Sequence, residues 1–138
     1  MKGKTINEMN IGDSASFAKT ITDADVKMFA GITGDFNPVH INKEFAKETM
    51  FKDRIAHGML VASLFSTVLG TQLPGEGAIY MGQEVKFTKP VYLEDTITAT
   101  VTVTELNVEK NRVVLETIAT NQNGDVVIKG SATLMPTK

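Results

Sequence analysis

Apolar and polar residues alternate most clearly in the second half of the chain. Apolar side chains occupy every second position of residues 97–103, and threonines occupy the positions between them. This two-residue period is typical of a β-strand with one buried face. Similar patterns, bounded by turn residues, predict further strands at residues 14–21, 78–89, 112–122 and 125–135. The strands of the C-terminal half are expected to form an antiparallel meander, with a type I′ turn at Asn123-Gly124.

The first half of the chain shows helical signals. Thr22 and Asp25 have the spacing of a capping box, and apolar residues on one helical face follow until Gly34. These signals predict a helix that begins after Thr22 and ends just before Asp35. A second, short helix is expected to begin after Asn42 and to run through Glu48.

A third helix is predicted at residues 58–72. Its apolar side chains cover most of the circumference rather than one stripe, which is typical of a helix enclosed by other parts of a fold. Helices in the first half and strands in the second indicate the α+β class, with a helix packed on an antiparallel sheet. A curled sheet would cover most of this helix, and a partner subunit is expected to cover the rest.

Length and composition narrow the class of protein. The chain has 138 residues, 42% of them hydrophobic, and we expect residues 1–138 to form a single domain. The net charge of −2 argues against a nucleic-acid or membrane-surface partner. Cysteine is absent, which excludes disulfides and thiolate sites and fits the cytoplasm. Residues 55–75 carry no formal charge, but polar residues interrupt them, so a buried helix is expected rather than a membrane span.

The first candidate for chemistry is the string from Gly34 to His40. It follows a predicted helix end and contains Asp35, Asn37 and Pro38. An Asx-Pro turn beside a surface histidine explains this string as well as a functional site does. As a site, the loop would hold a carboxylate and an imidazole on one rim, where both could bind the same water and move a proton.

The second candidate is the start of the apolar helix, Ala56-His57-Gly58-Met59. Amide N–H groups at a helix N-terminus lack partners within the helix and carry the positive end of its dipole, so they suit an oxygen that gains negative charge. Gly58 would let such an oxygen approach, although its position at the start of a helix also explains a glycine here. A capping or packing role explains His57 better than catalysis does.

Nucleophilic and metal chemistry have weaker support. Ser66 has no nucleophile-elbow motif around it, and a hydroxyl bonded to its own helix is the simpler explanation. Asp35, His40 and His57 are the plausible metal ligands, and their spacing fits neither a zincin nor a thiolate site. No metal is therefore expected.

Taken together, three strings resemble one known family. They are Asp35-x-Asn37-Pro38-x-His40, then Arg54-Ile55-Ala56-His57-Gly58-Met59-Leu60, then Tyr80-Met81-Gly82-Gln83 before a strand that ends at Pro90. In this order and spacing, over residues 12–134, the chain resembles the MaoC-like hot-dog proteins and most of all the (R)-specific enoyl-CoA hydratases. The resemblance implies a hot-dog fold, with a curled sheet around a long helix, and a homodimer. It also implies reversible hydration of trans-2-enoyl-CoA in fatty acid metabolism, with no cofactor and no metal.

The resemblance also assigns roles to residues. It implies that Asp35 and His40 are the catalytic pair, that Asn37 shapes their loop and that the Gly58 N–H is the oxyanion donor. The residues expected to contact the acyl-CoA substrate are Asn37, Ser66 and Leu69. The family's pattern is matched at Asp35, Asn37, His40, Gly58 and Ser66.

Other functions stay open at this point. Thioesterases and carrier-protein dehydratases of the hot-dog class place a carboxylate on the central helix, and residues 58–73 contain none. An acyl-carrier-protein-linked 3-hydroxyacyl dehydratase is still an alternative, because Lys43, Lys47, Lys52 and Arg54 suit either CoA phosphates or an acidic carrier. A non-catalytic domain that binds acyl thioesters is another, but it leaves Asp35 and His40 without a use.

Overall fold

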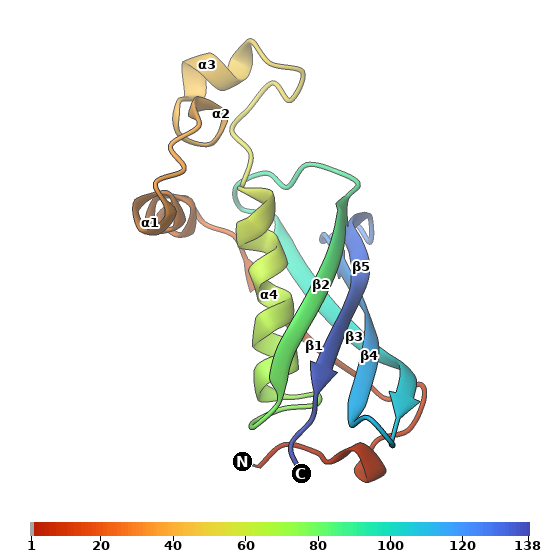
Figure 1. The fold of residues 1–138 in the computed structure, drawn as a ribbon. Helices are drawn as coiled ribbons and strands as arrows, with labels where there is room; N and C mark the ends of the chain where they lie inside the picture. Colours follow the sequence, from red (N-terminus) through yellow and green to blue (C-terminus); the bar gives the residue numbers. More distant parts are fainter. Residues whose placement is uncertain (1) are drawn as a thin grey trace.

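The computed structural model describes residues 2–138, which build one five-stranded antiparallel sheet with helices on one side of it (Figure 1). Its strands lie in the order β1-β3-β4-β5-β2. They are β1 (Ser14–Thr20), β2 (Ile79–Phe87), β3 (Thr96–Asn107), β4 (Arg112–Thr120) and β5 (Val126–Met135). The alternating positions predicted from the sequence point as expected, since Ile97, Ala99, Val101 and Val103 are all buried. The α+β class and the strand positions are confirmed.

Two details of the sheet differ from the sequence prediction. The meander comprises β3, β4 and β5, whereas β2 crosses over and pairs with β5 at the opposite edge. The prediction of a type I′ turn at Asn123-Gly124 is wrong. Such a turn needs a positive φ at both residues, and only Gly124 has one, of 81°. Asn121 organises a longer loop instead, as its Oδ1 accepts the N–H groups of Asn123 and Asp125.

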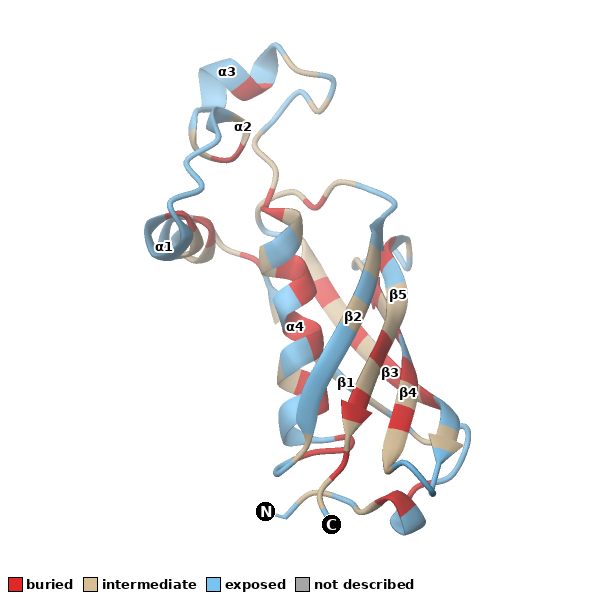
Figure 2. Ribbon diagram, viewed as in Figure 1, coloured by how far each residue is buried: buried red, intermediate tan, exposed pale blue. Residues whose placement is uncertain are grey.

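The long helix α4 (Gly58–Thr71) packs against the sheet, and its buried face forms the centre of the core (Figure 2). Phe65, Val68 and Leu69 are fully buried there. The prediction of an enclosed helix holds for this face only, since the opposite face is an exposed stripe of Met59, Ser63, Ser66 and Gly70. Within residues 2–138, no helix combines the length and hydrophobicity that a membrane span requires.

Between β1 and α4 the chain makes three helices that stand beyond one end of the sheet (Figure 1). They are α1 (Asp23–Thr33), α2 (Pro38–Ile41) and α3 (Lys43–Lys47). The predicted capping box of α1 is present, with Thr22 Oγ1 accepting the Asp25 N–H, and Gly34 ends the helix at φ 83°. The short helix α2 was not predicted, because its four residues read as part of a turn. A 3₁₀ turn, η1 (Ile6–Glu8), precedes β1.

Candidate active site

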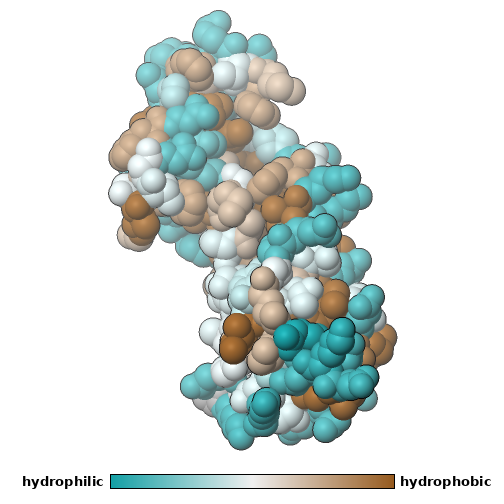
Figure 3. Space-filling model, viewed as in Figure 1, coloured by the Kyte–Doolittle hydropathy of each residue, from teal (hydrophilic) through white to brown (hydrophobic). Residues whose placement is uncertain are grey.

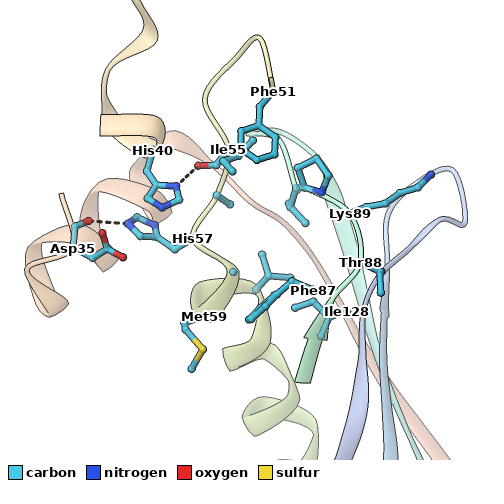
Figure 4. A pocket seen from close by; sticks show the side chains of 15 residues that line it. Asp35, His40, Phe51, Ile55, His57, Met59, Phe87, Thr88, Lys89 and Ile128 are labelled. Atoms are coloured by element: carbon cyan, nitrogen blue, oxygen red, sulfur yellow. Dashed lines mark hydrogen bonds between the residues drawn. The ribbon is translucent and has the colours of Figure 1, made fainter. Parts of the chain in front are cut away.

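A cavity of about 490 Å³ opens between α2, the first turn of α4 and the end of β2 (Figure 4). Asp35 and His40 line it from the segment between α1 and α3, and Gly58 lines it from α4. Hydrophobic side chains supply much of the remaining wall. They are Phe51, Ile55, Met59, Val61, Phe87, Val91 and Ile128. The structure thus brings the two candidate strings of the sequence to one cavity.

Hydrogen bonds within the loop after α1 hold Asp35. The Asp35 N–H donates to Thr33 Oγ1 at 3.2 Å, and the Asn37 N–H donates to Asp35 Oδ1 at 3.2 Å. Asn37 in turn caps α2, since its Oδ1 accepts the Val39 N–H at 3.3 Å. The carboxylate is exposed on the cavity rim, so the loop orients it while leaving it open to a ligand.

His40 lies on α2 with its ring fixed in one tautomer. Nδ1 lies 2.7 Å from the carbonyl oxygen of Ile55. A carbonyl only accepts, so Nδ1 carries the proton and Nε2 of the neutral ring is an acceptor. Burial lowers the pKa of the His40 imidazole below its ordinary value, which favours the neutral ring near pH 7. His40 therefore offers an unprotonated nitrogen to whatever lies beside Asp35.

Arg54 ties the short helices together behind the site. Its Nε donates to the carbonyl oxygen of His40 at 2.7 Å, and its Nη2 donates to Asp23 Oδ1 at 2.7 Å. The guanidinium thus joins the start of α1 to α2 through two hydrogen bonds in different directions. The single ammonium group of a lysine does not reproduce this geometry. Arg54 thus acts on the site through the position of His40.

Gly58 begins α4, so its N–H is one of the amides without a partner inside the helix. The structure also explains why this position is a glycine. A Cβ at position 58 would lie 2.6 Å from Cε1 of Phe87, whose ring packs against the Gly58 backbone. Phe87 comes from the end of β2, and nothing in its sequence context indicated this contact. Packing against Phe87 therefore explains a glycine at this position, and the approach of an oxygen to its N–H stays a prediction.

The three other predicted site residues lie outside this cavity. Asn37 contributes to it indirectly, through the loop of Asp35. Ser66 lies on the exposed stripe of α4, more than two helical turns after Gly58. Leu69 is fully buried in the core. Substrate contacts by these residues stay predictions.

One carboxylate oxygen of Asp35 and one ring nitrogen each of His40 and His57 lie within 4.8 Å of one another. The two imidazoles are stacked, with ring centroids 3.9 Å apart and an interplanar angle of 29°. An imidazole nitrogen binds a metal ion through a lone pair that lies in the plane of its ring. Because these two rings are stacked, an ion in the plane of one ring would lie well out of the plane of the other, and both rings could not bind it well. The cluster is thus better suited to proton chemistry than to holding an ion.

Comparisons with known proteins agree on one family. The family described as MaoC like domain matches residues 7–124. A Rhodospirillum rubrum protein named (R)-specific enoyl-CoA hydratase is 56% identical over 124 residues, covering 90% of this chain and 85% of that protein. An Aeromonas caviae protein of the same name is 44% identical over 124 residues, covering 90% and 92%.

A solved structure agrees with the sequence relatives. The unliganded (R)-hydratase from Pseudomonas aeruginosa superposes with a TM-score of 0.93 and 40% identity, covering 99% of this chain and 87% of that one. The hot-dog architecture inferred from the three sequence strings is therefore confirmed. With the family match spanning most of its length, the chain belongs to the MaoC-like family.

Proposed function

We propose that this protein catalyses the reversible (R)-specific hydration of trans-2-enoyl-CoA to (R)-3-hydroxyacyl-CoA. This proposal rests on one observation. The Asp35 carboxylate and the neutral His40 imidazole lie within 4.8 Å of each other, and they share a cavity with Gly58, the first residue of α4. The names of the relatives supply the substrate class and the stereochemistry. The cysteine-free composition fits a reducing compartment, and we place the reaction in the cytoplasm.

Asp35 and His40 suit the activation of one water molecule. Two acceptors that share a water lie about 4.5–5 Å apart, because each hydrogen bond spans about 2.8 Å. The carboxylate of Asp35 and Nε2 of His40 are both acceptors, so a water between them donates both protons and directs a lone pair at C3 of the enoyl chain. Asp35 takes one proton as the C3–O bond forms, and a proton from the pair is then delivered to C2.

Gly58 suits the charge that develops on the thioester. Addition of water at C3 moves electron density through C2 to the carbonyl oxygen, which becomes an enolate oxygen. The Gly58 N–H, together with the positive end of the α4 dipole, stabilises this oxygen more strongly in the transition state than in the substrate. The reaction as proposed needs no cofactor and no metal, because proton transfer and this hydrogen bond supply the chemistry.

The decisive experiment replaces Asp35 by Asn. The amide keeps the size of the side chain and an oxygen that accepts the Asn37 N–H, but it does not accept a proton. We expect hydration of crotonyl-CoA, followed by loss of the enoyl-thioester absorbance, to fall by about 10²–10⁴-fold with an unchanged melting temperature. Asp53→Asn is the matched control, since this carboxylate between α3 and α4 is also exposed but lies outside the cavity. Near-normal turnover by Asp35→Asn would exclude the mechanism.

The same preparations separate the alternatives. A carrier-protein dehydratase would turn over crotonyl-acyl-carrier protein and leave crotonyl-CoA almost untouched. A non-catalytic thioester-binding domain would bind crotonyl-CoA without changing its absorbance. His40→Gln should also reduce turnover, and the double variant with Asp35→Asn should lose less than the product of the two single losses, because the pair acts on one water.

We also propose that the protein is a homodimer joined through β2. This strand lies at the sheet edge, so one side of its backbone has no neighbouring strand, and Ile79, Met81 and Phe87 are each at least half exposed. Unpaired apolar edges favour pairing with another chain. Hydrophobic side chains interrupt the hydrophilic surface of the face that carries β2 and α4 (Figure 3). A second copy there would cover the exposed stripe of α4, where Ser66 could then line the acyl-chain path.

Light scattering with one charged variant tests the dimer. Met81→Lys puts a charge on the exposed edge of β2, and we expect it to give a monomer at micromolar concentration, where the unchanged protein is a dimer. Val108→Lys is the control, because Val108 is similarly exposed but follows β3 in a distant turn. A monomeric unchanged protein, or a dimer unaffected by Met81→Lys, would contradict pairing through β2.

A further inference from the structure

His57 lies at the centre of the site, but the mechanism above gives it no role. It directly precedes α4 as its N-cap, and only 2% of its surface is exposed. One face of its ring stacks on His40 at 3.9 Å, and Phe29 of α1 lies 4.8 Å away at a tilt of 54°. Its Nε2 lies 2.9 Å from the backbone oxygen of Asp35, as Figure 4 shows.

The hydrogen bond to Asp35 fixes the protonation of the ring. The partner is a carbonyl oxygen, which only accepts, so Nε2 of His57 carries a proton. Nδ1 is buried and has no hydrogen-bond partner among the described residues. A proton on Nδ1 would be a buried donor without an acceptor, which costs free energy, so the geometry favours the tautomer with its proton on Nε2. His57 is therefore a donor held in one tautomer.

Packing alone does not explain a histidine at this position. A buried nitrogen without a partner costs free energy, and a phenylalanine would fill the space between Phe29 and His40 without that cost. What histidine adds is the Nε2–H that reaches the Asp35 backbone. Asp35 lies in an exposed loop that follows a glycine, so the internal hydrogen bonds of this loop do not fix its distance from α4.

We propose that His57 is a positioning residue, whose Nε2–H holds the Asp35 loop against the first turn of α4 and whose ring face orients His40. The inference rests on the proposed function, because it assigns Asp35, His40 and Gly58 to one reaction. His57 and Gly58 are neighbours in sequence, so one peptide unit links the residue that holds the base to the amide that faces the thioester oxygen. The hydrogen bond from His57 thus links the backbone of the proposed base directly to the turn that carries the proposed oxyanion donor.

Two substitutions separate the hydrogen bond from the packing. His57→Phe keeps a ring against His40 and removes the donor, whereas His57→Gln keeps an N–H donor at about the position of Nε2 and removes the ring. We expect His57→Phe to lower kcat for crotonyl-CoA by about 10²-fold with KM within twofold, because a shift of about 1 Å in a reacting group has this effect. His57→Gln should retain kcat within about tenfold of the unchanged protein.

Phe29→Leu is the matched control. Phe29 touches the same ring but makes no hydrogen bond to Asp35 and does not line the cavity. It should lower the melting temperature with little effect on kcat per folded molecule. The proposal is overturned if His57→Phe keeps more than half of kcat, if its loss is mainly in KM, or if His57→Gln is as poor as His57→Phe.

A measurement on the unchanged protein covers the case in which the variants do not fold. Long-range ¹H–¹⁵N correlation spectra distinguish the two imidazole nitrogens, and they should show the proton of His57 on Nε2, the nitrogen that faces the Asp35 carbonyl oxygen. A proton on Nδ1 instead would remove the donor to Asp35 and overturn the proposal. If the unchanged protein fails to hydrate crotonyl-CoA, the proposed function fails, while the spectra still decide whether His57 holds the Asp35 loop.

Discussion

Replacing Gly58 by Ala tests its proposed role as the oxyanion donor. The new methyl group would lie 2.6, 2.9 and 3.1 Å from three atoms of the Phe87 ring. Carbon atoms in contact lie about 3.5–4.0 Å apart, so the ring must move by about 1 Å. Because Phe87 is half exposed at the end of an edge strand, it can move at modest cost, and we expect a loss of stability of about 1 kcal/mol.

The catalytic effect should be much larger than this loss of stability. Phe87 and Gly58 share the cavity, so we expect a displaced ring to enter the space proposed for the thioester oxygen beside the Gly58 N–H. Removing one oxyanion donor typically costs about 10²–10³-fold in kcat, and we expect Gly58→Ala to approach this range. The melting temperature should fall by only about 3–4 °C. Crotonyl-CoA hydration and thermal unfolding of the same preparation measure both quantities.

A double-mutant cycle with Phe87→Val identifies the cause. Valine lacks all three ring atoms that the methyl group would meet, so Gly58→Ala should cost much less in this background, in both stability and turnover. An equal cost in both backgrounds would show that the ring contact is not the reason for glycine at position 58. Full turnover by the single variant Gly58→Ala would refute the oxyanion assignment itself.

Two further predictions follow from the residues around His40. Protonation of His40 would turn its Nε2 into a donor that no longer accepts a hydrogen bond from water. Because burial lowers the pKa of this imidazole, kcat/KM should stay high as the pH falls and should drop only below about 6.5. A pH profile with a histidine-dependent drop above that value would contradict this. Arg54→Lys loses one of the two bonds to His40 and Asp23 and should lower stability by about 1–2 kcal/mol, measured by urea unfolding, whereas Lys52→Arg, at an exposed neighbouring position, should not.

The fold could be predicted because its signals are local and periodic. The alternation at residues 97–103 and the capping box of Thr22 both depend on neighbours within a few positions. The place of β2 at the far sheet edge depends on pairing with β5, about 50 residues later, and periodicity does not contain that information. The turn after β4 was mispredicted because Asn121, outside the dipeptide, bonds to two amides and widens the loop.

The site was predictable only in part, because some of its contacts join residues that are far apart in the sequence. Asp35, His40 and Gly58 stand in short strings whose residue types suggest chemistry, and the structure places all three on one cavity. Phe87 gave no such signal, since an aromatic residue at a strand end has many ordinary uses. Its contact with Gly58 joins residues 29 positions apart and becomes visible only when β2 and α4 are placed side by side.

The string around Gly58 shows why neighbouring residues of one motif can serve different parts of a site. Gly58 lines the cavity, while the side chain of His57 points to the Asp35 loop. On the other side, Ala56 donates its N–H to Val91 at 2.7 Å and so attaches the start of α4 to the segment between β2 and β3. Three consecutive residues thus connect the segment between β2 and β3, the proposed base and the proposed oxyanion donor. A shift of this turn would move all three together, so we expect the geometry of the proposed site to depend on the rigidity of the turn as well as on the hydrogen bond from His57.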